Sequence, residues 1–378
     1  MDALTTLSNW QKVRLGDIAE IIGGGTPSTQ ITSFWNGSIN WFTPTEIGIT
    51  KYVYKSQRTI TPLGLKKSSA KLLPIGTILL TSRASIGDCA ILKVVATTNQ
   101  GFQSLIPLEK INNEFLYYLM LTLKNKLLKL ASGSTFLEVS PNKIKNLLIP
   151  LPPLNEQIAI ANVLSDVDHY LYSLDALILK KESVKKALSF ELLSQRKRLR
   201  GFNQNWQRVR LGDIANYLTS NLSAEQITQQ GKIKVYDVNN FIGYTNTTFI
   251  SDKPYISIVK DGSVGRVRIL PPKTNILSTM GALIANHKTT TEFLFYLLSN
   301  FDFKNFTSGS IIPHIYFKDY KEKTIFLPPL NEQIAIANIL SALDHEIISL
   351  KNKKRQFENI KKALNHDLMS AKIRVLNK

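Results

Sequence analysis

Two stretches of this chain occur twice, and this repetition constrains the fold more than any other feature. The twelve residues 151–162 return unchanged at 327–338, and 16 of 19 positions agree between 151–169 and 327–345. A second element at 9–19 returns at 205–215 with one substitution. Internal repetition of this kind indicates a chain that is built from a repeated structural unit. The sequence therefore predicts one architecture used twice.

The segments between the repeated elements differ in length and in sequence. One element returns after 196 residues and the other after 176, so the segment between them is about twenty residues shorter in the second copy. We therefore expect variable and constant blocks to alternate. The predicted domains are a first variable domain at 1–150, a first helical spacer at 151–200, a second variable domain at 201–326 and a second helical spacer at 327–378. Constant blocks suit an unchanging partner, and variable blocks suit two different targets.

Each constant block is predicted to form a long helix that starts after a Pro-Pro pair, because proline is tolerated only at the start of a helix. From Leu164 to Leu192, and again from Leu340 to Leu368, seven of nine positions at alternating spacings of three and four are apolar. That pattern is typical of a coiled coil over four heptads. The first helix is expected to run from about residue 155 to 199, which corresponds to about 65 Å. The basic residues 196–198 would complement the dipole of its last turn.

The two long helices are expected to pair with each other in antiparallel directions. A parallel pair would set Lys185 against Lys361 in one core layer, and like charges there are destabilising. An antiparallel pair would place Lys185 near Ile347 and Lys361 near Leu171. The lysine stems could then lie along apolar surface.

The variable blocks are predicted to be mixed α/β domains, because both contain the same parts in the same order. These parts are a β-rich run, a glycine turn, an apolar helix and a Ser-Gly-Ser loop, at 75–81, 86–88, 113–119 and 132–134 in the first domain and at 255–259, 261–265, 291–297 and 308–310 in the second. The expected fold class is α+β. Two α/β domains are joined by two long antiparallel coiled-coil helices in a pseudo-two-fold repeat.

The net charge of +19 points to a polyanionic partner, most often nucleic acid. A solvated lysine surface is the alternative reading of this charge. Cys89 is the only cysteine, which excludes an intrachain disulfide and fits a cytoplasmic protein. No apolar run approaches the ~20 residues of a membrane span. The N-terminal residues lack the pattern of a secretion signal.

No motif of the chain assembles into a catalytic centre. The glycine-rich segment 23–28 lacks the Gly-Lys-Ser/Thr ending of a phosphate loop. His169 and His345 lie beside Asp168 and Asp344 at matching helical positions, where surface histidines are expected rather than metal ligands. We therefore expect a non-catalytic protein without a cofactor or a metal.

The repeated motifs resemble those of the specificity subunit of type I restriction-modification enzymes. The resemblance rests on the Trp-x-x-Val-Arg-Leu-Gly-Asp-Ile opening of each variable block and the Leu-Pro-Pro-Leu-x-Glu-Gln opening of each constant block. It extends to the segments 76–83 and 97–102. One departure is that 278–282 reads Ser-Thr-Met-Gly-Ala where the first copy has Thr-Asn-Gln-Gly-Phe, so base-reading residues cannot be transferred between the domains.

This resemblance implies a DNA-binding subunit with two target-recognition domains that read the two halves of a split, asymmetric site in double-stranded DNA. It also implies that the helices dock two modification methyltransferase subunits, which restriction subunits with translocase and nuclease activity would join. The alternative is a coiled-coil scaffold that joins two protein-binding domains.

Two groups of site residues follow from these arguments. Cationic and amide side chains beside glycine turns are expected to approach DNA. They are Lys66, Lys67, Arg83 and Gln100 in the first domain and Lys260, Arg266 and Arg268 in the second. The repeated triplets are expected to seat the methyltransferase subunits, with helix capping and packing on the chain's own domains as the alternative. These triplets are Asn155, Glu156 and Gln157, and Asn331, Glu332 and Gln333.

Overall fold

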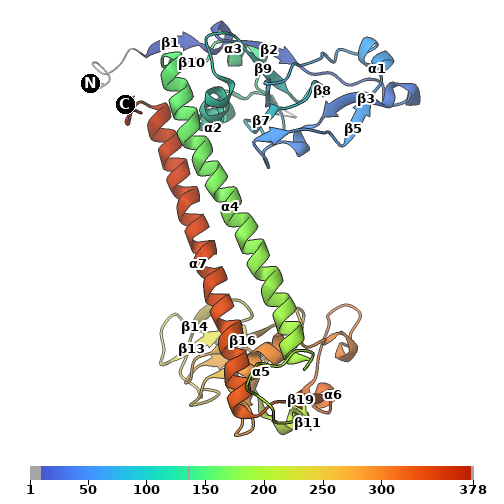
Figure 1. The fold of residues 1–378 in the computed structure, drawn as a ribbon, viewed down its shortest axis with the longest axis vertical. Helices are drawn as coiled ribbons and strands as arrows, with labels where there is room; N and C mark the ends of the chain where they lie inside the picture. Colours follow the sequence, from blue (N-terminus) through green and yellow to red (C-terminus); the bar gives the residue numbers. More distant parts are fainter. Residues whose placement is uncertain (1–9, 134–136, 376–378) are drawn as a thin grey trace. The chain divides into compact units, whose positions relative to one another are not determined.

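The computed structural model describes residues 10–133 and 137–375, and within them the sequence repeat is a repeat of fold (Figure 1). Asn9 of the first repeated element and Ser134 of the first Ser-Gly-Ser loop lie outside the described residues. The chain divides into two compact units, Met1–Leu174 with Lys354–Lys378, and Asp175–Lys353. Each unit therefore contains one variable block and one half of each long helix.

The repeated elements close each variable domain by pairing with each other. Strand β1 (Gln11–Arg14) pairs antiparallel with β10 (Leu148–Leu151). In the second unit β11 (Gln207–Arg210) pairs in the same way with β19 (Thr324–Leu327). The Pro-Pro pair follows directly after β10 and β19. The elements that bracket a variable domain in the sequence are thus neighbours in space, which explains why they stay constant together.

Between these closing strands each unit has a larger and a smaller sheet. In the first unit the larger sheet has the order β2 (Ala19–Gly23), β9 (Gln103–Pro107), β6 (Ile78–Leu80), β7 (Cys89–Leu92) and β4 (Tyr52–Val53), and the smaller has β5 (Arg58–Ile60), β3 (Trp35–Phe42) and β8 (Ala96–Thr98). In the second unit the larger sheet has β12 (Ala215–Thr219), β18 (Met280–Ala285), β15 (Tyr255–Val259) and β16 (Val267–Leu270), and the smaller has β14 (Phe241–Thr245), β13 (Ile233–Tyr236) and β17 (Asn275–Ile276). The strand orders correspond one to one except for β4. Among the described residues the second unit has no equivalent of β4, in keeping with its shorter variable block.

Helices pack against these sheets, and their starts are capped as the sequence dictates. Helix α2 (Asn113–Leu130) begins after Asn112, whose side chain accepts a hydrogen bond from the Phe115 amide. Helix α5 (Thr291–Ser299) begins in the same way after Thr290. The short helices are α1 (Pro62–Lys66), α3 (Pro141–Lys145) and α6 (Phe317–Tyr320), and the 3-10 turns are η1 (Leu15–Asp17), η2 (Thr32–Phe34), η3 (Pro44–Glu46), η4 (Leu211–Asp213), η5 (Ala224–Gln226) and η6 (Lys304–Phe306).

The core of each unit is shared between the variable domain and the long helices. In the first unit Phe115 of α2 is fully buried in one cluster with Leu164 and Leu368 of the long helices. In the second unit Phe293 of α5 lies in the equivalent cluster with Leu340. Burial of large apolar side chains at about 25 cal/mol per Å² is the main stabilising contribution at such an interface. Each domain is therefore packed onto the helices rather than only connected to them.

The long helices α4 (Leu154–Leu193) and α7 (Leu330–Met369) have 40 residues each, or about 60 Å at 1.5 Å per residue. They lie side by side in Figure 1. In the first unit Asp168 pairs with Lys361, and the ring centroids of Tyr170 and Phe357 are 4.6 Å apart. Partner numbers on α7 fall as those on α4 rise, so the predicted antiparallel direction is confirmed.

The second unit has the same direction of pairing, with different lysine contacts from those expected. Lys181 Nζ lies 2.7 Å from Glu346 Oε1, and Lys185 Nζ lies 2.5 Å from Asp344 Oδ1. The expectation that lysine stems simply cover apolar surface was therefore incomplete. Lys185 and Lys361 are each paired with an aspartate of the other helix, Asp344 and Asp168 respectively.

The first helix is shorter than expected. It ends at Leu193 rather than near residue 199, and Gln195 has a φ of 61°. That left-handed conformation stops an α-helix. The basic residues 196–198 therefore follow the helix instead of forming its last turn.

Candidate nucleic-acid interface

A set of turns at one edge of each larger sheet brings the predicted DNA-contacting segments together. In the first domain the Ser82 amide donates to Gly101 O at 2.8 Å, and the Val139 amide donates to Ser82 O at 3.1 Å. In the second domain the Lys260 amide donates to Thr279 O at 3.1 Å, and the Ile315 amide donates to Lys260 O at 2.9 Å. We call this region the turn edge, comprising 81–88, 99–102 and 132–139 (134–136 outside the description) in the first domain and 259–266, 277–280 and 308–315 in the second.

An ionisable pair occupies the same point of both turn edges. In the first domain Arg83 and Glu138 form an isolated backbone bridge, and their side chains pair at 2.8 Å. In the second domain Asp261 and His314 form the matching bridge, and Nδ1 of His314 lies 2.7 Å from Asp261 Oδ1. Because a carboxylate only accepts, His314 Nδ1 is the donor. Glu138, Asp261 and His314 are not among the site residues predicted from the sequence. Aligning the two Ser-Gly-Ser loops with the residues that follow them would have pointed to these positions.

Gln100 lies at the turn edge of the first domain, beside the glycine-rich segment. Its side-chain oxygen accepts a hydrogen bond from Thr26 Oγ1. The glycines are needed for close backbone approach: a Cβ added to Gly24 would lie 1.9 Å from Asn99 O, and one on Gly25 would lie 2.3 Å from Ala70 N. This segment is therefore glycine-rich because it packs against backbone.

Lys66 and Lys67 lie apart from Arg83 in the architecture. Lys66 ends α1, which packs on the smaller sheet, and Lys67 follows it; both are exposed. Arg83 follows β6 of the larger sheet. The structure thus groups Arg83 with Gln100 at the turn edge and places the two lysines on another layer.

In the second domain, two of the three predicted residues converge on one turn. Arg266 Nη2 donates to Asn239 Oδ1 at 3.0 Å, and Arg268 Nη1 donates to Asn239 O at 2.8 Å. The Arg268 guanidinium also lies 5.3 Å from the ring centroid of Tyr236. Lys260 lies at the turn edge itself. Asn239 is a further residue that the sequence analysis did not single out, because nothing local links the turn after β13 to these arginines.

The glutamates of the repeated triplets are buried in matching contacts. Glu156 accepts a hydrogen bond from Trp10 Nε1 at 3.1 Å and two from Arg374 at 3.0 and 2.9 Å. Glu332 accepts from Trp206 Nε1 at 3.0 Å and from Arg198 at 3.2 and 2.7 Å. The hydrogen bonds that Arg374 donates to Glu156 raise the pKa of its guanidinium. Each triplet glutamate therefore joins the first strand of its domain to the segment after the opposite long helix.

The glutamines of the triplets hold the domain to the helix start. Gln157 Nε2 donates to Pro152 O at 2.9 Å and Lys110 O at 3.1 Å, and its Oε1 accepts from the Asn112 amide. Gln333 makes the equivalent contacts with Pro328 O, Lys288 O and the Thr290 amide.

The asparagines of the triplets, in contrast, are exposed. The side chains of Asn155 and Asn331 accept hydrogen bonds from the next backbone amide, at 2.9 Å in each copy. Exposed apolar side chains flank them, with Leu154 and Ile158 in the first copy and Leu330 and Ile334 in the second. The start of each long helix thus combines a buried polar attachment with an outward-facing surface that is the same in both copies.

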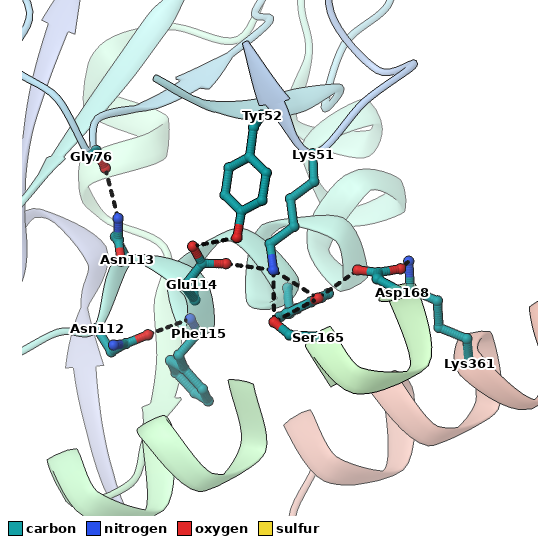
Figure 2. Close-up of polar contacts among 11 residues, drawn as sticks. Lys51, Tyr52, Gly76, Asn112, Asn113, Glu114, Phe115, Ser165, Asp168 and Lys361 are labelled. Carbon is teal, nitrogen blue, oxygen red and sulfur yellow. Dashed lines mark hydrogen bonds and ion pairs between the residues drawn. The ribbon is translucent and has the colours of Figure 1, made fainter. Parts of the chain in front are cut away.

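A buried polar network attaches α2 to the long helices in the first unit (Figure 2). Lys51 Nζ donates to Tyr118 OH at 2.9 Å and Ser165 Oγ at 2.8 Å, and lies 2.5 Å from Glu114 Oε2. Tyr118 OH in turn donates to Asp168, the partner of Lys361. Burial and the hydrogen bond to Asp168 raise the pKa of the Tyr118 hydroxyl, so it stays a donor.

The second unit repeats the tyrosine–aspartate–lysine part of this network. Tyr296 OH donates to Asp344 at 2.8 Å, and Lys185 pairs with the same carboxylate. Asp168 and Asp344 therefore serve as attachment points between domain and helices.

His169 and His345, which follow these aspartates in the sequence, are exposed. Within the described residues no group of three or more His, Cys, Asp or Glu side chains could hold a metal ion. In the same part of the chain, no helix has the length and apolar character to cross a membrane.

Comparison with known proteins places this architecture in one family. The model of the type I restriction modification DNA specificity domain matches residues 7–181 and 203–359. The MjaIX specificity subunit of Methanocaldococcus jannaschii is 30% identical over 97% of this chain and 94% of its own length. The EcoR124I/EcoR124II specificity subunit of Escherichia coli is 36% identical over 41% of this chain and 40% of its own length.

Solved structures share the fold at lower identity. The type I S subunit from M. genitalium has a TM-score of 0.62 at 21% identity, and the match covers 97% of this chain and 98% of that one. The HsdS subunit from Thermoanaerobacter tengcongensis has a TM-score of 0.55 at 18% identity, with 97% and 98% covered.

The chain belongs to the type I restriction-modification specificity family. It is the DNA-specificity subunit of a type I system, a non-catalytic role in this family.

Proposed function

We propose that the chain reads a bipartite, asymmetric sequence in double-stranded DNA, with one half-site for each variable domain. The proposed target-recognition domains are 1–150 and 201–326, and the proposed spacers are 151–200 and 327–378. The observation that carries this proposal is the pair of turn edges, which share a backbone arrangement but differ in side chains. Equivalent scaffolds with unlike side chains favour two unlike half-sites.

The seven predicted residues are proposed to contact DNA in two ways. Lys66 and Lys67 are exposed and lie outside the turn edge, which suits contacts to the phosphate backbone. Arg83, Gln100 and Lys260 belong to the turn edge, where side chains can approach base edges. Arg266 and Arg268 are held in place by Asn239, which would lower the entropy lost on binding.

The repeated helix starts are proposed to dock two modification methyltransferase subunits, which restriction subunits join in the cytoplasm. The triplets support this in two parts. Glu156, Gln157, Glu332 and Gln333 orient the helix starts through buried contacts, whereas Asn155 and Asn331 face outward beside exposed leucine and isoleucine side chains. A partner that binds twice needs the same surface twice.

Co-expression with the methyltransferase from the same operon, followed by long-read mapping of modified bases, tests the function. The expected result is a single motif of two different half-sites separated by unread base pairs. A complex that modifies a continuous or palindromic site would contradict two unlike readers. DNA binding without sequence preference at any salt concentration would instead favour the scaffold.

The docking proposal is tested by Asn155→Arg and Asn331→Arg together with Ile158→Asp and Ile334→Asp. The folded variant is expected to lose methyltransferase subunits, measured as the mass of the purified complex. A matched control is Asp166→Arg with Ala342→Arg, at exposed helix positions beyond the triplets. Unchanged stoichiometry in the first variant would refute docking at the helix starts.

A further inference from the structure

The two ionisable pairs at the turn edges hold equivalent places with the hydrogen-bond donor and acceptor exchanged. In the first domain the cation Arg83 follows the central strand and the carboxylate of Glu138 lies on the loop. In the second domain the carboxylate of Asp261 follows the central strand and the imidazole of His314 lies on the loop. The backbone bridges that place them are the same in both domains. The backbone of the turn edge therefore accepts the donor on either of the two paired positions.

Both pairs remain accessible from solvent. The side chains of Arg83 and Glu138 are 41% and 32% exposed, and those of His314 and Asp261 are 35% and 29% exposed. A pair that only held the loop in place would not need to be exposed to solvent. The loop of the second domain also projects outward, since Ile311 is 93% exposed.

The chemistry of the four side chains matches the hydrogen-bonding edges of bases. A guanidinium has five N–H donors, so Arg83 keeps donors for guanine O6 and N7 after pairing with Glu138. A carboxylate accepts from cytosine N4, which suits Asp261. His314 uses Nδ1 for Asp261, so its Nε2 edge can face a base.

We propose that Arg83–Glu138 and Asp261–His314 are specificity-determining pairs, each reading one base pair of its own half-site. This inference rests on the proposed function, because it presupposes two half-sites. It goes further by assigning one position of each half-site to a structurally equivalent pair. The exchanged polarity gives the two domains opposite donor and acceptor patterns at that position.

The decisive variant transfers the first pair into the second domain, as Asp261→Arg with His314→Glu. The first domain shows that this polarity is compatible with the backbone. We expect modified-base mapping of the co-expressed complex to show one changed base pair in one half-site, and no change in the other. The reciprocal variant, Arg83→Asp with Glu138→His, should change one base pair in the opposite half-site.

If the pair only fastens the loop, the transferred pair should fasten it equally well. A complex that modifies the original sequence at the original rate would then overturn the proposal.

If the double variant does not fold, His314→Gln is used with duplexes that carry each single substitution in the second half-site. Discrimination at one position should fall by about 5- to 150-fold, the range typical of one base contact. Unchanged discrimination at every position would also overturn it. Failure of the proposed function is separate, because the wild-type complex would then show no split motif.

Discussion

The Arg374 guanidinium donates two hydrogen bonds, of 3.0 and 2.9 Å, to the Glu156 carboxylate, although the two residues are 218 positions apart in the sequence. The carboxylate belongs to the first turn of α4 and the guanidinium to the segment after α7. Glu332 and Arg198 repeat this relationship in the second unit. Each unit thus ties the start of one long helix to the end of the other, and the tryptophan that opens the domain completes the contact.

Arg198→Met should destabilise the second unit by about 3 kcal/mol, because it leaves the buried Glu332 carboxylate without its cation. Urea unfolding followed by tryptophan fluorescence measures the effect, since Trp206 bonds the same carboxylate. Arg200→Met is the matched control on the same segment, and its exposed side chain predicts a change within about 0.5 kcal/mol. Equal urea midpoints for the two variants would contradict a stabilising role for the Arg198–Glu332 pair.

Lys51→Met should destabilise the first unit by about 2 to 4 kcal/mol, because it removes the cation that joins Glu114, Tyr118 and Ser165. Thermal unfolding and amide exchange in α2 are the measurements. Lys124→Met is the control, since Lys124 also pairs with a carboxylate but is 44% exposed. Surface pairs contribute at most about 1 kcal/mol. If Lys124→Met destabilised the first unit as much as Lys51→Met, burial of the network would not be important for stability.

Cys89 should be unreactive in the folded protein. The thiol is 2% exposed, and burial raises its pKa to about 12, with Asp88 adding to the shift. Raising the pKa of an acid favours its neutral form, so at pH 8 only about one thiol in ten thousand is the reactive thiolate. Labelling with a disulfide reagent at pH 8 should be negligible without denaturant and complete in it. Full labelling of the native chain within minutes would refute this.

Alanine at Lys66 and Lys67 should weaken DNA binding about equally for all sequences. If each contacts one phosphate, the slope of log affinity against log salt should become shallower by about 1 per residue. Lys129→Ala, at an exposed position of α2, is the control and should leave the slope unchanged. Relaxed sequence preference with an unaltered slope would instead place the lysines at bases.

The parts of this protein that could be predicted from sequence are those with a local or repeated signature. The twelve-residue repeat predicted two equivalent copies, and the apolar spacing after Leu164 and Leu340 predicted two long helices, because helical periodicity is visible in neighbouring residues. Like charge at Lys185 and Lys361 was enough to predict the antiparallel direction. The family resemblance added the function, which the comparisons confirm.

Only the tertiary structure decided which side chains meet. The conformation of Gln195 ended α4 at Leu193, and the helix register gave Lys185 and Lys361 their aspartate partners. The triplet glutamates Glu156 and Glu332 are buried against Trp10 and Trp206, a contact that no spacing along the chain reveals. Asp261 and His314 are 53 residues apart, and they meet because two loops close over the end of one strand. Periodicity records which face of an element is apolar, whereas contacts between distant loops depend on how the whole domain packs.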